Sequence, residues 1–305
     1  MKPEWSNYQD YFHRHWAHLQ HPDVRSLAWL LDAPLLLNLH HPRWKNQLAQ
    51  LPPVSSITKV WLTELDREPA ALQEFLAVHS HTRLGHYAED LLAFYFNWRD
   101  ELVAHSLQVR SHTTIGEFDF LLNTIAGFEH WEFACKFYLF VAPSQQLSDF
   151  VGPNLMDNLN DKSNKIMDAQ LALGSHKDAQ KYLSKPLSAA KALLKGWLFY
   201  PAKDSLSLPE IAPGHCRGLW CRLSALHDLD GDCFIVLPRL NWLAPAKISL
   251  SAMELTRNRA ELLRKLTEQF LSDDRPVLIS QLEQRDNFLV ETERIFVVPD
   301  DWNQS

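Results

Sequence analysis

Glycine and cysteine are scarce in this chain, and their scarcity argues against several classes of protein. The 305 residues include 9 glycines and 4 cysteines. No glycine-rich phosphate loop is present, which argues against a nucleoside triphosphatase. The 15 histidines show no H-E-x-x-H spacing, and the cysteines do not form two close pairs, so neither a zinc peptidase nor a structural zinc site is predicted. We expect the cysteines to be free thiols in a cytoplasmic protein.

Long apolar runs are lacking as well. The most apolar early segment, LAWLLDAPLLLNL, contains Asp32 and Pro34 and is too short to span a bilayer. The first residues, MKPEWSNYQDYFHRHW, contain no apolar stretch like that of a signal peptide. We therefore expect a cytoplasmic location and no membrane partner. The formal net charge of −7 argues against a surface that is basic throughout, but it leaves room for a local basic groove.

Hydrophobic periodicity divides the chain into three predicted parts. Residues 1–78 show apolar positions three and four apart, which predicts helices. Residues 79–203 are predicted to form a helix, three strands, a long helix over 151–174 and a strand, with the segment KDAQKYLSKPLSAAKALLKG continuing as helix. Residues 204–305 mix strands with a periodic helix, for which Ser251 and Glu254 would form a capping box. No polar linker precedes this last part, so we expect it to pack on the same sheet.

The stretch GEFDFLLNTIAGFEHWEFACKFYL, residues 116–139, carries unexpected charge for two apolar strands. Side chains alternate along a strand. We therefore expect Glu117 and Asp119, with Glu132 and Lys136 on the second strand, to share one face of the hairpin. The other face would hold its phenylalanines: Phe118, Phe120, Phe133 and Phe137. A hairpin with one face in water would explain the charges, but strands this apolar are more typical of a sheet centre.

Carboxylates that point into a central cleft have a chemical use. They can hold Mg²⁺, a hard ion that prefers oxygen ligands and keeps several waters. A lysine beside the ion can orient the attacking water and offset charge as a phosphodiester is attacked. A salt bridge between Asp119 and Lys136 is the structural alternative.

The order of these elements resembles the PD-(D/E)XK nuclease superfamily over roughly residues 83–202. A helix with an acidic residue is followed by GE-x-D on one strand, an acidic residue and a lysine on the next, a helix and a strand. The resemblance implies an α/β (mixed α+β) fold. Its restriction-endonuclease-like core, a central mixed sheet flanked by helices, would occupy 79–203, after a helical N-terminal segment (1–78) and before an α/β C-terminal extension (204–305).

The resemblance also implies a Mg²⁺-dependent nuclease acting on DNA or RNA, with Mn²⁺ able to replace Mg²⁺. Asp119, Glu132 and Glu117 would be the metal ligands. Lys136 would position water, and Glu89, on the preceding helix, would contact the metal or its water. Lys162 and Gln170, on the later helix, would be accessory polar residues.

One position departs from the superfamily pattern. Ala134 stands where an acidic residue is expected, two positions before Lys136. The nearest carboxylate on that face, Glu132, has its Cα roughly 13 Å from that of Lys136, against about 7 Å for the usual pair. The alternative is therefore a catalytically degenerate protein that binds nucleic acid or another protein. A run of lysines could contact phosphates of a nucleic acid, or it could be an ordinary solvated face. These lysines are Lys177, Lys181, Lys185, Lys191 and Lys195.

A second resemblance spans most of the chain. The segments VRSLAWLLDAPLL, GHYAEDLLAFYF, FVGPNLMDNLNDK, AQLALG and VLPRLNWLAP are similar to signatures of the bacterial family called domain of unknown function 1853. This resemblance implies membership of that family and no particular activity.

Overall fold

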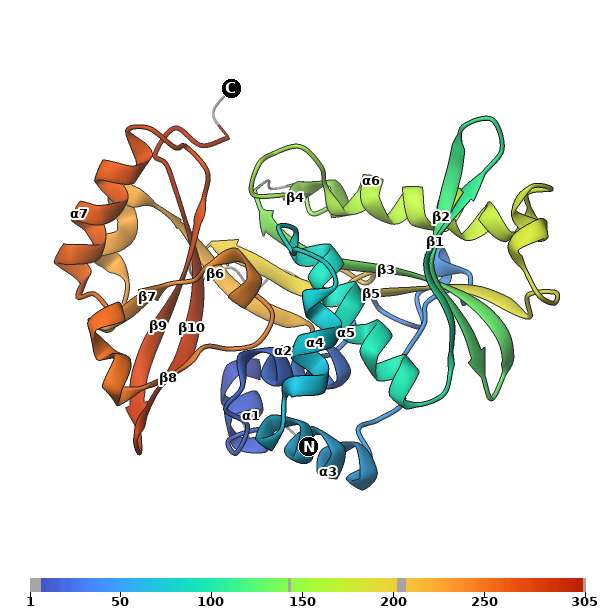
Figure 1. Cartoon of the computed structure of the whole chain (residues 1–305). Coiled ribbons are helices and arrows are strands. Elements are labelled where there is room, and N and C mark those ends of the chain that lie inside the picture. The colour runs from blue at the N-terminus through green and yellow to red at the C-terminus, as the bar shows by residue number, and fades with distance from the viewer. Residues whose placement is uncertain (1–6, 142–143, 202–206, 304–305) are drawn as a thin grey trace.

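A single mixed β-sheet with helices on both faces organises the chain (Figure 1). The computed structural model describes residues 7–141, 144–201 and 207–303. In these ranges the sheet has ten strands, in the order β1-β2-β3-β5-β6-β10-β9-β7, with β4 beside β3 and β8 beside β10. The strands are β1 (Leu102–Arg110), β2 (Thr114–Thr124), β3 (Gly127–Phe140), β4 (Phe150–Val151), β5 (Ala189–Pro201), β6 (Cys216–Arg222), β7 (Phe234–Val236), β8 (Lys247–Ser249), β9 (Val277–Arg285) and β10 (Phe288–Val298). The expected mixed α+β fold is confirmed.

The N-terminal part is helical, as its periodicity predicts. It contains α1 (Tyr8–His15), α2 (Pro22–Asp32), η1 (Pro42–Trp44), α3 (Ser56–Arg67) and α4 (Ala70–Ala77). Its apolar side chains join those of α5 (Leu84–Trp98) and of β3 in the largest buried cluster, where Trp29 stacks on Trp197 at 6.3 Å. The helices α1 to α4 therefore cover one face of the sheet (Figure 1), whereas Trp44 of η1 packs in the cluster of α6 on the opposite face.

The predicted order from α5 to β5 is confirmed. β1, β2 and β3 are adjacent and antiparallel, and β5 lies parallel to β3 on its other edge. The connection from β3 to β5 runs over the opposite face of the sheet from α5. It contains η2 (Leu147–Asp149), α6 (Leu159–Asn164), the π-helical turn η3 (Lys165–Gln170), η4 (Leu171–Ser175) and η5 (Ala179–Tyr182).

Two of the expected helical segments are wrong in extent. The long helix begins at Leu159 rather than near residue 151, because Phe150–Val151 pairs with β3 and the Asn158 side chain caps the helix. The segment from Ala189 onward is strand, not helix. Its alanines and leucines suit a helix locally, but parallel pairing with β3 from Glu129 to Leu139 buries this strand at the sheet centre, and tertiary packing outweighs propensity.

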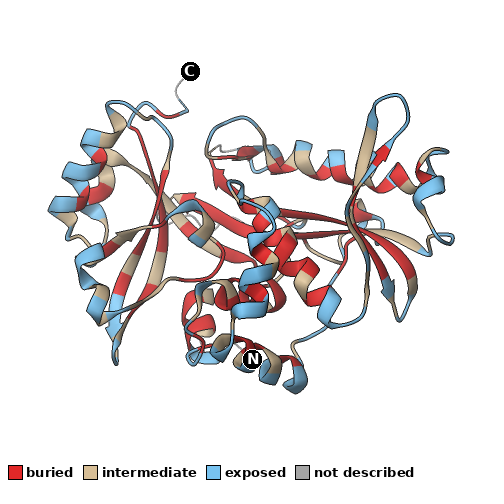
Figure 2. Cartoon of the chain, in the orientation of Figure 1, coloured by how far each residue is buried: buried red, intermediate tan, exposed pale blue. Residues whose placement is uncertain are grey.

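The C-terminal part continues the same sheet, as expected. β6 is parallel to β5, and β10 is parallel to β6. Figure 2 shows the central strands buried and the outer side of α7 (Arg259–Phe270) exposed. The capping box of α7 is Asn258 with Glu261, not Ser251 with Glu254. Three short helices lie between β6 and α7: η6 (Leu223–Asp228), η7 (Arg239–Asn241) and η8 (Leu250–Leu255). Ser251 and Glu254 belong to η8, and a β-bridge between Arg257 and Phe234 separates η8 from α7.

Among the described residues, no helix is both long and apolar enough to cross a membrane. The boundaries at 78/79 and 203/204 stay predictions, since the sheet itself runs without a break from β5 to β6.

Candidate functional site

The site lies where β2 and β3 separate. Their pairing runs from Thr124–Gly127 to Phe120–Trp131 and ends there. Further along, β3 pairs with β4 only at Leu139 and Phe140. Within the described residues, the edge of β3 from Glu132 to Tyr138 therefore has no strand partner on this side. Acidic side chains occupy the resulting gap.

A kink in the first two strands alters the expected division of faces. Ser106 has a left-handed backbone (φ 49°) and lies across from Asp119, between the pairs His105–Phe120 and Leu107–Phe118. Phe120 packs in the cluster that contains α5, whereas Phe118 packs with Leu173 on the other side of the sheet. The expectation that Phe118 and Phe120 share a face is wrong, because the alternation of side chains is broken at Asp119.

The carboxylates consequently approach the gap from both faces. A Cβ at Gly116 would point toward Leu173. Because side chains alternate along a strand, the next residue, Glu117, points to the other face, where α5 carries Glu89. Glu132 faces the opposite side, where it contacts Gln170 of the π-helical turn. Asp119 sits between them at the kink. The sequence argument placed these groups on one face, whereas the structure brings them together around the end of a strand pairing.

Each oxygen of the central pair has a defined partner. Asp119 Oδ2 accepts a hydrogen bond from the Phe133 backbone N–H at 2.8 Å. Glu132 is buried, with Oε1 2.8 Å from His130 Nε2 and Oε2 accepting from the Gln170 amide. These contacts fix both carboxylates, as supporting hydrogen bonds do for metal-ligating carboxylates.

Burial and mutual repulsion perturb the acidic groups. Burial, and then the charge of Asp119, raises the pKa of Glu89 to about 8. Burial, and then the charge of Glu132, raises the pKa of Asp119 to about 7. Burial also raises the pKa of Glu132 to about 7, although Lys162 opposes this shift. Full ionisation of the three carboxyl groups is therefore unfavourable unless further positive charge is bound beside them.

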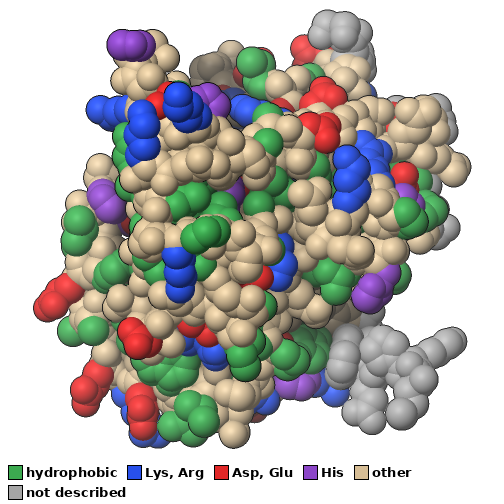
Figure 3. Space-filling view, turned by 90° about the vertical axis from the view of Figure 1, so that its right-hand side faces the viewer, with side chains coloured by type: hydrophobic (Ala, Val, Ile, Leu, Met, Phe, Trp, Pro, Cys, Tyr) green, Lys and Arg blue, Asp and Glu red, His purple; other side chains and the backbone are tan. Residues whose placement is uncertain are grey.

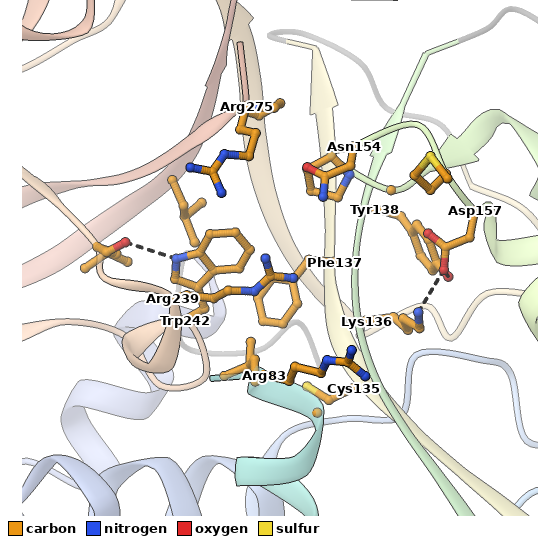
Figure 4. A pocket seen from close by; sticks show the side chains of 18 of the residues that line it. Arg83, Cys135, Lys136, Phe137, Tyr138, Asn154, Asp157, Arg239, Trp242 and Arg275 are labelled. Atoms are coloured by element: carbon orange, nitrogen blue, oxygen red, sulfur yellow. Dashed lines mark hydrogen bonds and ion pairs between the residues drawn. The ribbon is translucent and has the colours of Figure 1, made fainter. Parts of the chain in front are cut away.

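Lys162, rather than Lys136, is the cation that faces these carboxyls. Lys162, on α6, is attracted by both Asp119 and Glu132, while burial lowers its pKa. Its Nζ lies 3.4 Å from Gln170 Oε1, and Gln170 in turn contacts Glu132. Lys136 instead forms an ion pair with Asp157, with Nζ 2.8 Å from Oδ2 (Figure 4). The role predicted for Lys136 stays a prediction, and Lys162 is the nearer candidate.

The donor set suits Mg²⁺ better than a closed, all-protein metal site. In the part of the chain that the structure describes, no group of three or more His, Cys, Asp or Glu side chains could hold a metal ion. Mg²⁺, however, is usually held by one or two carboxylates together with water and substrate phosphate. Asp119 and Glu132 supply such a pair, with Glu89 and Glu117 on the α5 side.

The lysine run does not form one solvated face. Lys195 is buried and donates to the Ala33 carbonyl, and Lys191 pairs with Glu129 at 2.7 Å. Lys181 pairs with Asp178. On the face of the molecule shown in Figure 3, basic, acidic and apolar side chains are interspersed. A basic site for nucleic acid is therefore better sought elsewhere.

His130 and Asp157 belong to this region but were not predicted. Burial lowers the pKa of His130 to about 4, so its ring is neutral where it meets Glu132. Its position two residues before Glu132, on the same strand face, was the available signal. Asp157 lies in the loop before α6, and its contact with Lys136 depends on tertiary structure alone.

Comparisons with known proteins give one match. The family model described as "Domain of unknown function (DUF1853)" matches residues 25–298. No curated protein and no solved structure matches the chain. Since the matched region covers most of the sequence, the chain belongs to the DUF1853 family.

Proposed function

We propose that this protein is a Mg²⁺-dependent nuclease that hydrolyses phosphodiester bonds in nucleic acid. The main support for the proposal is that the carboxyl groups of Glu89, Asp119 and Glu132 lie close together where β2 and β3 separate. Lys162 lies beside them. The order of elements around this point, from α5 to β5, is the one that the nuclease resemblance implies. We also propose that the protein acts in the cytoplasm.

The chain's own residues have distinct tasks in this proposal. Asp119 and Glu132 are the ligands, held in place by the Phe133 N–H and by His130 and Gln170. Bound Mg²⁺ would polarise the scissile phosphate and lower the pKa of an attacking water. Lys162 places a positive charge beside the same carboxyls and offsets charge that develops on the phosphate.

Two further residues complete the arrangement. Glu89 reaches the site from α5, and it also lines a cleft open to substrate together with Lys136 and Lys162. Glu117, on the same side as Glu89, adds negative charge that a divalent ion would neutralise. Substrate phosphate in this cleft would therefore have both lysines and Glu89 within the same lining.

The test compares the wild type with Asp119→Asn. Asparagine keeps the size of the side chain and an oxygen that can accept from the Phe133 N–H, but it removes the charge. Cleavage of plasmid and of a labelled single strand with Mg²⁺ or Mn²⁺ should be lost. Thermal stability without metal should be equal or higher, because one source of repulsion is removed. Asp168→Asn, which changes an exposed residue of the π-helical turn, is the matched control and should leave cleavage intact.

A second candidate function rests on Ala134. This residue occupies the position at which the superfamily pattern has an acidic ligand, and its side chain is buried in the apolar cluster around α6. A protein that binds nucleic acid without cleaving it would show binding, but no hydrolysis with either metal. Hydrolysis by the wild type that disappears in Asp119→Asn would exclude this candidate.

A further inference from the structure

A cleft of about 720 Å³ opens beside the acidic site. One wall is the free edge of β3 from Phe133 to Tyr138, and a second is the first turn of α5. The loop Gly152–Asp157 and two segments of the C-terminal part, around Trp242 and Arg275, complete it. Figure 4 shows these residues facing one another across the space. Glu89, Lys136 and Lys162 also line the cleft, so it reaches three of the candidate catalytic groups.

The cleft is locally basic in a chain of net negative charge. Five Lys or Arg residues line it against three Asp or Glu residues. Arg83 and Arg239 are exposed, and within the described residues their guanidinium groups make no ion pair or hydrogen bond. Arg275 pairs with Asp273, and Lys136 pairs with Asp157. Two guanidiniums without an ion pair among the described residues, one at the start of α5 and one on η7, therefore line the cleft and are available to an anionic ligand.

Planar groups lie beside these cations. Trp242 is half-buried, with its ring 5.4 Å from Phe137 and the Arg239 guanidinium 5.5 Å from its centroid. Its Nε1 donates to the Leu237 carbonyl at 3.1 Å, which fixes the ring. Met156, across the cleft, is 87% exposed. Nucleobases stack on aromatic rings and on guanidinium planes of this kind.

We infer that this cleft binds a single-stranded nucleic acid, with Arg83 and Arg239 on its phosphates and a base against Trp242. The inference rests on the proposed function, since it assigns the substrate class of the same site. Phosphate contacts alone would suit a duplex equally well. A fixed indole inside a cleft suits unpaired bases, because the faces of duplex bases are already stacked.

Binding is measured by fluorescence anisotropy with labelled oligothymidine and oligouridine, in EDTA so that no cleavage occurs. Arg83→Ala/Arg239→Ala should weaken binding of both strands by roughly tenfold or more per arginine, as expected for loss of a charge-assisted hydrogen bond. The slope of log K against log salt concentration should become shallower by ~1.4, or about 0.7 for each lost phosphate contact. Trp242→Ala should weaken binding without changing this slope.

A gain-of-charge variant tests the cleft without removing any contact. Gly85, in the first turn of α5, has no atom within 4 Å of the place a Cβ would occupy. Gly85→Glu should therefore fold and abolish binding, whereas Gly85→Ala should bind like the wild type. Arg264→Ala, which changes an exposed arginine on α7, is the control for total charge and should also bind normally.

The outcomes separate this inference from the proposed nuclease activity. Cleavage by the wild type with unchanged binding in Arg83→Ala/Arg239→Ala and Gly85→Glu would overturn the inference and leave the nuclease standing. Binding that these variants lose, without cleavage by the wild type, would support the cleft and refute the nuclease. Tighter binding of a duplex, or equal competition by polyglutamate, would show that the cleft serves a duplex or an acidic peptide and would overturn the inference.

Discussion

Glu89→Gln should make the protein more stable at pH 8 and leave its stability at pH 4.5 unchanged. Glu89 is largely buried on α5, and burial together with the charges of Asp119 and Glu117 raises its pKa from 4.5 to about 8. Between these two pH values the folded protein binds more protons at this site than the unfolded chain does. The free energy of unfolding therefore falls as pH rises through this window.

The size of the effect follows from the same shift. At ~1.4 kcal/mol per pKa unit, a rise from 4.5 to about 8 corresponds to ~5 kcal/mol at pH 8. The neighbouring carboxyls share the repulsion and remain in the variant, so we expect Glu89→Gln to recover about half, ~2 kcal/mol. Glutamine has nearly the same volume, and no hydrogen bond of the Glu89 side chain is lost within the described residues.

Urea unfolding in EDTA at pH 4.5, 6, 7 and 8 measures this difference. The wild-type and variant curves should coincide at low pH and diverge steadily above pH 5. Glu268→Gln changes an exposed glutamate on α7 and should follow the wild type throughout. Parallel curves for the wild type and Glu89→Gln at every pH would refute the reasoning, because they would mean that Glu89 carries its charge in the folded protein without penalty.

Two further predictions concern the scaffold of the site. Gly196→Ala should destabilise the fold by several kcal/mol in urea unfolding, because Gly196 has φ 150° and a Cβ would lie 1.8 Å from the Lys136 carbonyl oxygen; Gly214→Ala, at an open position, should change little. Arg294→Met should cost about 3–5 kcal/mol by the same measurement, since it leaves buried Glu291 without its ion pair at 2.8 Å. The Arg294 guanidinium also holds the carbonyls of residues 242–244, so this variant should weaken oligonucleotide binding as well.

The order of the core elements was predictable because each signal is local. The helical face of α5 and the apolar strands on either side of Gly127 can be read from spacing alone. The end of the β2–β3 pairing is different, since it coincides with a kink at Asp119, across from the left-handed backbone of Ser106. A serine in an otherwise ordinary strand gives no sign of such a kink. The sequence therefore predicted correctly that Asp119 and Glu132 are neighbours. It placed them wrongly on one face of a regular hairpin.

At the start of β5, the local sequence predicted the wrong secondary structure. Residues 189–196 are rich in alanine and leucine, and their helical propensity was the only local information. Pairing with β3 along eleven positions overrode it. The same pairing brings Gly196 close to the backbone of Lys136, which accounts for the glycine at this position.

Substitution of Lys162 or Lys136 tests which of these two lysines acts in catalysis. Lys162→Met keeps the length of the side chain but removes the cation that faces Asp119 and Glu132. We expect kcat for cleavage to fall by ~10²-fold or more, the usual effect of losing one group that stabilises transition-state charge. The rise in melting temperature on adding Mg²⁺ should become larger, because the carboxyls then repel one another without an internal counter-charge. Lys136→Met should have the smaller effect on kcat, since Lys136 is already paired with Asp157. The reverse result, with kcat lost only in Lys136→Met, would mean that the Lys136–Asp157 pair breaks when substrate binds and that the strand lysine is the catalytic one after all.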